Sequence, residues 1–150
     1  MKIYVDSNEA EAHPFIVSAL KDGGKNEIEI KHLECGDYFC PPVLIEAKTN
    51  LADYVSSVKD GRIFQQGQDM LYTRSQNLDT KIYILISGNL DNLWKLGHTL
   101  PTDPLIAAWA SLNVQGIPTS FVGGHYFLIK GMLNLFNKYN DGKIRSYNPI

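Results

Sequence analysis

Two acidic residues and one lysine in the first half of the chain have the types and the spacing of a catalytic site. Glu46 and Lys48 stand two positions apart in an apolar run, and Asp37 precedes them by nine residues. Side chains two apart on a strand project from the same face, so Glu46 and Lys48 point together and Ala47 points away. If the chain turns at Pro41-Pro42 and the flanking segments pair, Asp37 lies opposite Glu46. Two carboxylates and one ammonium group then converge.

This set of groups suits metal-assisted hydrolysis of a phosphodiester. Carboxylate oxygens bind a hard divalent cation such as Mg²⁺, which polarises a phosphoryl oxygen and lowers the pKa of a bound water. Lys48 could position that water or offset charge in the transition state, and the Ala47 backbone carbonyl could be a further ligand. The alternative is a solvated charge pair at a sheet edge, because so short a motif also occurs by chance.

The surrounding sequence predicts a sheet that would carry these residues. Period-two alternation and apolar, β-branched runs predict strands at 3–5, 27–31, 37–39, 43–48, 81–86 and 117–122. Helical periodicity predicts helices at 13–20, 51–72, 89–97, 103–114 and 125–139. The order favours an α/β fold with a mixed central sheet flanked by helices.

The long helix predicted at 51–72 has two further signals. Asn50 has the character of an N-cap, and Asp53 three residues later is interpreted as part of the cap rather than as a metal ligand. Gly61 inside the pattern costs roughly 1 kcal/mol relative to alanine, so we expect a bend or a packing reason there.

Composition places the chain among ordinary globular domains. It has 150 residues, 44% of them hydrophobic, and a net charge of −2, which argues against nonspecific nucleic-acid affinity by bulk attraction. We expect one domain over residues 1–150. The apolar runs are too short for a membrane span and no signal peptide is present, so we expect an intracellular protein that is not secreted. Cys35 and Cys40 are expected to be unpaired thiols.

Four motifs, in the right order, resemble those of the XPF-type (ERCC4-domain) structure-selective endonucleases, a branch of the PD-(D/E)XK nuclease superfamily. The family's V-D-x-R-E reads Val5-Asp6-Ser7-Asn8-Glu9, and its G-D-Y reads Gly36-Asp37-Tyr38. Its I-E-R-K-T reads Ile45-Glu46-Ala47-Lys48-Thr49, and its helical D-G-R motif with a following glutamine is matched from Asp53 to Gln66. The resemblance implies a restriction-endonuclease-like fold and a metal-dependent DNA endonuclease that acts on flaps, forks or junctions in DNA repair or recombination.

Carried over residue by residue, the resemblance implies a role for each motif position. Asp37 and Glu46 would be ligands of Mg²⁺ or Mn²⁺, and Lys48 would be the catalytic lysine. Further carboxylates would come from Asp6, also as a metal ligand, and from Glu9. The DNA-binding residues would be Arg62 and Gln66, which lie one helical turn apart and would contact the phosphate backbone or brace the acidic residues.

Two departures from the family pattern keep a second hypothesis open. Asn8 and Ala47 stand where the family has arginine. Losing two cations would weaken the grip on DNA, and the alternative function is a catalytically weakened, nuclease-fold DNA-binding or scaffold subunit. The sequence shows no helix-hairpin-helix repeats, so a partner, a dimer or the domain's own loops would supply selectivity.

The C-terminal half of the chain is the expected dimer interface. The resemblance implies a homodimer that forms through helices at 104–112 and 125–136. Trp94, Trp109, Tyr126 and Phe127 could in principle stack on bases, but their helical spacing among leucines and alanines favours core or interface positions. Gly123-Gly124 before the last helix is interpreted as a turn rather than as a phosphate site.

Overall fold

The chain forms one six-stranded mixed sheet with helices on both faces. The computed structural model describes residues 1–89, 91–92 and 102–142. The strands are β1 (Lys2–Asp6), β2 (Glu27–Lys31), β3 (Tyr38–Cys40), β4 (Val43–Lys48), β5 (Lys81–Ser87) and β6 (Thr119–Val122). They lie in the order β2-β1-β3-β4-β5-β6, with β3 antiparallel to its two neighbours and the other pairs parallel. The predicted α/β fold with a mixed central sheet is confirmed.

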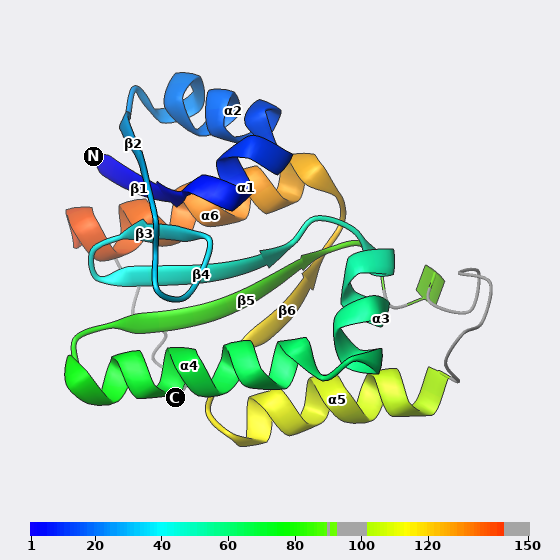
Figure 1. The fold of residues 1–150 in the computed structure, drawn as a ribbon. Coiled ribbons are helices and arrows are strands. Elements are labelled where there is room, and N and C mark those ends of the chain that lie inside the picture. Colours follow the sequence, from blue (N-terminus) through cyan, green and yellow to red (C-terminus); the bar gives the residue numbers. More distant parts are fainter. Residues whose placement is uncertain (90, 93–101, 143–150) are drawn as a thin grey trace, which may run out of the picture.

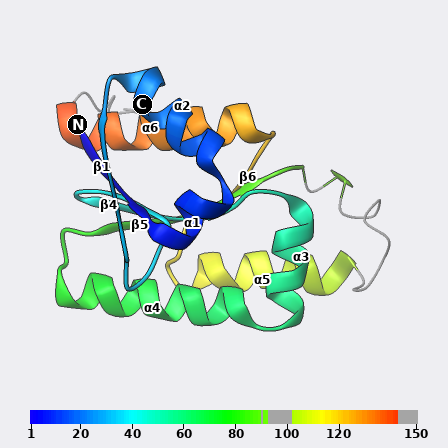
Figure 2. The ribbon, with the colours of Figure 1, turned by 45° about the horizontal axis from the view of Figure 1, so that its top comes forward.

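The helices divide into two layers, one on each face of the sheet (Figures 1 and 2). They are α1 (Ser7–Ala12), α2 (Pro14–Gly24), α3 (Leu51–Lys59), α4 (Arg62–Gln76), α5 (Thr102–Val114) and α6 (His125–Asp141). Helices α2 and α6 lie on one face, and α3, α4 and α5 lie on the other. Each layer closes its own apolar core, with Ile45 in the first core and Leu44 in the second.

Strand β4 runs through the centre of the sheet and carries the motif residues. All six of its residues are buried, as the apolar run predicts. The turn at Pro41-Pro42 joins it to β3, and the ladder between these two strands ends at the Tyr38–Ile45 pair. The side chains of β4 alternate between the two cores, and Glu46 and Lys48 belong to the face that α4 covers.

One element was missed and one was predicted wrongly. Helix α1 has no sequence signal, because none of its residues is buried and a helix without a buried face has no apolar period. The helix predicted at 51–72 is two helices, since Asp60 caps α3 and Gly61 adopts a positive φ of 80° between them. Glycine adopts that conformation without steric cost, so Gly61 turns the chain between α3 and α4, and the bend expected at this position is present.

Other expectations are refined by the structure. The strand predicted at 27–31 is an edge strand, four of whose five residues are exposed. Tyr126 and Phe127 are 66% and 57% exposed, so a core position was wrong for both. Most of the helix predicted at 89–97, with Trp94, falls outside the described residues. No helix in the described part of the chain is long and apolar enough to cross a membrane.

Candidate active site

Three carboxylates stand in one row across neighbouring strands. Extending the β1–β3 and β3–β4 registers by one residue places Asp6 beside Asp37 and Asp37 beside Glu46. The Asp6 N–H donates to the Asp37 carbonyl at 2.9 Å, as the β1–β3 register requires. The Asp37 N–H donates to the Ile45 carbonyl at 2.8 Å, one residue out of the β3–β4 register, so the ladder is irregular at this point. The side chains of Asp37 and Glu46 are nevertheless close enough to interact, as predicted.

Asp37 is tied to β4 by its side chain as well as by its backbone. Its Oδ2 accepts a hydrogen bond of 2.8 Å from the Ala47 N–H, beyond the point where the ladder between the strands ends. Burial raises the pKa of Asp37 well above its usual range, and the neighbouring carboxylates of Glu46 and Glu9 raise it further. The site therefore disfavours a second negative charge unless a cation joins it.

Glu46 and Lys48 point to the same side, as their spacing predicts. The Lys48 Nζ lies 3.4 Å from Glu46 Oε1 and donates a 2.7 Å hydrogen bond to Gln66 Oε1 on α4. Lys48 is only 2% exposed, which fixes its ammonium group in place. Burial raises the pKa of Glu46, and the Lys48 charge opposes that effect. This ion pair is enclosed, so the interpretation of a solvated pair at a sheet edge is wrong.

Glu9 approaches the same site from α1. Its Oε1 accepts a 2.8 Å hydrogen bond from the Tyr38 hydroxyl. Burial raises the pKa of Glu9 to about 7, and the charges of Glu46 and Asp53 act in the same direction. Glu9 is half-buried, and with this pKa its carboxyl group can bind or release a proton near neutral pH.

Asp6 lines the same cleft and also organises its wall. Its Oδ2 accepts from the Asn8 N–H at 3.2 Å and caps α1, and its Oδ1 accepts from the Leu33 N–H at 2.9 Å. His32 Nδ1 lies 3.7 Å from that Oδ1. Asp6 therefore fastens the loop after β2 to the row of carboxylates.

The two residues predicted to bind DNA have different surroundings. Gln66 accepts a hydrogen bond from Lys48, whereas the sequence predicted that it would contact DNA or brace the acidic residues. Arg62 is half-exposed and bonds to Asp60 at 2.8 Å, with Asp53 at 3.9 Å. A Cβ added at Gly61 would meet nothing within 4 Å, so its positive φ, rather than a close contact within the chain, accounts for the glycine.

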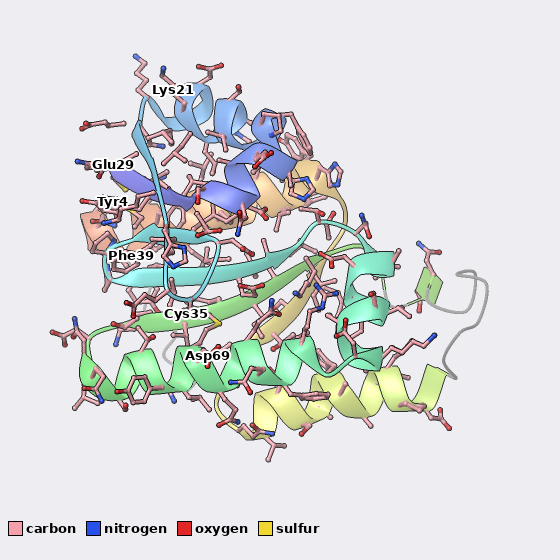
Figure 3. The ribbon with its side chains drawn as sticks, viewed as in Figure 1. Tyr4, Lys21, Glu29, Cys35, Phe39 and Asp69 are labelled. Atoms are coloured by element: carbon pink, nitrogen blue, oxygen red, sulfur yellow. The ribbon has the colours of Figure 1, made fainter. Side chains whose placement is uncertain are left out.

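A cleft of about 200 Å³ opens over the row of carboxylates. Its lining comes from β1, α1, the loop after β2, β4 and α4, namely Asp6, Asn8, His32, Leu33, Glu34, Cys35, Gly36, Asp37, Glu46, Gln66 and Asp69. Figure 3 shows Cys35 near α4 in the region of Asp69, and Cys35 Sγ lies 3.1 Å from Thr73 Oγ1. The loop 32–36 therefore spans from the sheet to α4 and forms one wall.

Sequence reasoning missed part of this lining. Asp69 follows Gln66 by three residues, and that helical spacing alone could have identified it. His32 and Glu34 had no such signal, because only the path of the loop places them beside Asp37.

The donor set fits a hard divalent cation held by few protein ligands. In the described part of the chain, no three side chains of His, Cys, Asp or Glu are close enough to form a complete metal site. Asp37 and Glu46 provide two adjacent carboxylates, and the N–H and C=O of a strand residue face the same way, so the Ala47 carbonyl faces Asp37. Mg²⁺ commonly binds one or two carboxylates and keeps several waters, which matches this set.

Comparisons with known proteins support this description. The chain resembles "XPF from Aeropyrum pernix" with a TM-score of 0.73 at 23% identity, over 93% of this chain and 65% of that one. It also resembles that protein in complex with DNA, with a TM-score of 0.71 at 21% identity, over 97% of this chain and 68% of that one. The chain thus spans about two thirds of these proteins' length.

A comparison with curated proteins finds no match. A family model, the ERCC4 domain, matches residues 5–126, which include every motif residue, strands β2 to β6 and helices α1 to α5. The resemblance predicted from the motifs is confirmed: the chain belongs to the ERCC4 domain family.

Proposed function

We propose that this chain is a divalent-metal-dependent DNA endonuclease that hydrolyses phosphodiester bonds in branched or structured DNA. The observation that carries the proposal is the convergence of Asp37, Glu46 and Lys48 at one end of the central strands, with their charges enclosed. Family membership and the DNA complex of a protein with the same fold support DNA as the substrate.

Different residues of the chain would bind the metal ion and stabilise the charge on the phosphate. Asp37, Glu46 and the Ala47 carbonyl would hold Mg²⁺ or Mn²⁺, with Asp6 at the rim; when bound, the ion supplies Lewis-acid polarisation and an acidified water. Lys48 is held by Gln66 and Glu46 where it can offset negative charge on the reacting phosphate.

Glu9 has the protonation behaviour of a group that assists proton transfer. Its carboxylate lies in the electrostatic field of Glu46 and Lys48, and its pKa is raised to about 7. A group with a pKa near the working pH exchanges protons most effectively. We therefore assign Glu9 the role of proton acceptor or relay at the edge of the site.

A cleavage assay tests the proposed function. Purified protein is incubated with end-labelled flap, fork and four-way-junction DNA in Mg²⁺ or Mn²⁺, with linear duplex as the reference. Wild-type protein should cleave a branched substrate, and Asp37→Asn and Lys48→Met should lose at least about 100-fold in rate, the scale of removing a transition-state contact. No cleavage by wild type on any substrate, or undiminished cleavage by Asp37→Asn, contradicts the proposal.

A scaffold function is the second candidate, and Asn8 and Ala47, which stand where the family has arginine, favour it. A weakened subunit would bind DNA or a partner without needing a metal. Calorimetric titration with Mn²⁺ separates the two functions. A nuclease should bind the ion with a measurable heat of binding, and Glu46→Ala should abolish that heat. Metal-independent DNA binding without cleavage would favour the scaffold.

We also propose that the chain forms a homodimer through α5, β6 and α6. Helix α5 is apolar on most sides, with Ile106 and Val114 exposed, and α6 exposes Tyr126 and Phe127. Such exposed apolar side chains mark interaction surfaces. Light scattering should give a dimer for wild type and a monomer for Ile106→Glu. Ile30→Glu, at an exposed position of β2 on the opposite edge of the sheet, is the control.

A further inference from the structure

Two histidines from different parts of the chain converge on the residue that follows Lys48. His125, the first residue of α6, has its Nε2 2.7 Å from the Thr49 carbonyl oxygen. His13, between α1 and α2, has its Nε2 3.3 Å from Thr49 Oγ1. Thr49 itself is only 3% exposed. Groups separated by 76 and 36 residues in sequence therefore meet at the end of β4.

The direction of the stronger contact follows from chemistry. A carbonyl oxygen can only accept, so His125 Nε2 carries the hydrogen and donates it. The Phe15 ring lies 5.1 Å from the His125 ring and 6.3 Å from the His13 ring. Phe15 therefore contacts both imidazole rings.

The end of β4 depends on such contacts. The ladder with β3 stops at Ile45, and the ladder with β5 stops at Lys48, so Thr49 lies just past both. Thr49 is followed by Asn50, the N-cap of α3, where the chain leaves the sheet. The position of the Lys48 backbone therefore depends on what holds Thr49.

We infer that His125, supported by His13, is a positioning residue: it holds Thr49 and thereby fixes the Lys48 ammonium between Glu46 and Gln66. The inference rests on the proposed function for its catalytic consequence, but the placement of Lys48 can be measured without cleavage. His125 contacts no reacting group and acts only through Thr49.

Two substitutions separate the hydrogen bond from the packing of the ring. His125→Phe keeps a ring against Phe15 and removes the donor, whereas His125→Gln keeps a donor at a similar reach and removes the ring. Ser18→Ala, at an exposed position of α2 in the same layer of helices, is the control. Thr49→Val removes the hydroxyl that His13 contacts and leaves the carbonyl.

The first readout is the reactivity of the Lys48 amine toward reductive methylation with ¹³C-formaldehyde, followed by NMR of the full chain without DNA. Lys48 should be methylated slowly in the wild type and in the His125→Gln and Ser18→Ala variants. His125→Phe should methylate it several-fold faster, with the rates of the exposed lysines unchanged. Thr49→Val should give an intermediate rate.

The second readout is single-turnover cleavage of branched DNA at saturating protein, alongside DNA affinity. His125→Phe should lower the cleavage rate by roughly 3- to 10-fold, the scale of one hydrogen bond, with the Kd for DNA within about twofold of wild type. His125→Gln should restore most of the rate. A positioning residue moves the rate and not the affinity, whereas a misfolded variant loses both.

The outcomes distinguish this inference from the proposed function. If the wild type cleaves no substrate but His125→Phe speeds methylation of Lys48, the positioning role of His125 is supported and the endonuclease function is overturned. If the wild type cleaves DNA and His125→Phe leaves both the Lys48 amine reactivity and the cleavage rate unchanged, the positioning role of His125 is overturned. Equal loss of rate in His125→Gln and His125→Phe also overturns it, because the donor would then be irrelevant.

Discussion

The Lys48 ammonium donates a 2.7 Å hydrogen bond to the side-chain oxygen of Gln66, which joins β4 to α4. This contact supplies a neutral acceptor to a buried cation whose other partner, Glu46, lies farther away at 3.4 Å. Removing one partner of a buried charge leaves part of its desolvation uncompensated. Gln66 therefore contributes to both the stability and the proposed chemistry of the site.

Gln66→Leu should destabilise the protein by about 1–3 kcal/mol, the usual scale for an unsatisfied buried donor, and should slow cleavage by about tenfold. Denaturant unfolding and single-turnover cleavage measure the two effects. Gln66→Glu keeps an acceptor and should retain more of the activity than Gln66→Leu. Gln65→Leu, whose partner is Asp69 on the helix surface, is the control and should change neither quantity. A fully active, fully stable Gln66→Leu would contradict the role assigned here.

Asp37→Asn should abolish cleavage yet make the metal-free protein more stable. Burial and the neighbouring carboxylates disfavour the ionised Asp37, so the neutral amide removes a repulsion in the folded state. Thermal unfolding in EDTA should give a higher Tm for the variant, and added Mg²⁺ should raise the Tm of wild type only. A lower Tm than wild type in EDTA would mean that the hydrogen bond to the Ala47 N–H outweighs the repulsion.

The stability of the metal-free protein should fall as the pH rises from about 5 to about 8. Glu9 has a pKa of about 7 in the folded state against an ordinary 4.5, so the folded state binds the proton more tightly. Stability from this group is fully present below the unfolded pKa and is lost as the pH rises through the folded pKa. Because Glu9 is partly exposed, roughly 1–2 kcal/mol is expected.

Glu9→Gln provides the control for that pH dependence. The amide keeps an acceptor for the Tyr38 hydroxyl but does not titrate, so urea unfolding from pH 5 to pH 8 should show a flatter profile. The raised pKa values of Asp37 and Glu46 act in the same direction and leave a residual slope. Wild-type stability that rises across this window would refute the assignment.

DNA binding at the cleft should require a divalent cation. Among the described residues that line it, Asp6, Glu34, Asp37, Glu46 and Asp69 are acidic, and like charge repels phosphate. Fluorescence anisotropy with a branched DNA should show Kd tightening by on the order of tenfold or more when Ca²⁺ replaces EDTA at constant ionic strength. Glu34→Gln removes a negative charge from the wall of the cleft and leaves the row of carboxylates intact, so it should lower the Kd for DNA measured in EDTA. Equal affinity with and without the cation would place the DNA elsewhere.

Gly61→Ala should destabilise the protein by about 1 kcal/mol through the backbone alone. Gly61 has a φ of 80°, and the space around it is open, so the added methyl meets no atom of the chain. Gly61→Asn should cost less, because asparagine tolerates this conformation better than alanine. Chemical denaturation measures both variants, and a neutral Gly61→Ala would show that the turn between α3 and α4 can relax.

The sequence alone determined the sheet and the core of the site. The apolar β-branched run of β4 predicted a central strand, and the alternation of side chains along it placed Glu46 and Lys48 together. The turn at residues 41–42 brought Asp37 opposite Glu46, and the Asn50 cap was confirmed by its 2.8 Å bond to the Asp53 N–H. All of these follow from contacts within a few residues or between adjacent strands, which local patterns encode.

Only the tertiary structure decided the rest. Helix α1 has no buried residue, and the loop 32–36 enters the cleft because Asp6 binds the Leu33 N–H. The sequence predicted a bend or a packing reason at Gly61, and the structure decided for a full break between two helices. The contact of His125 with Thr49 spans 76 residues. Such contacts join side chains that are far apart in sequence, and no periodic pattern predicts them. The raised pKa values of Asp37, Glu46 and Glu9 arise from burial, so they too depend on how the helices pack on the sheet.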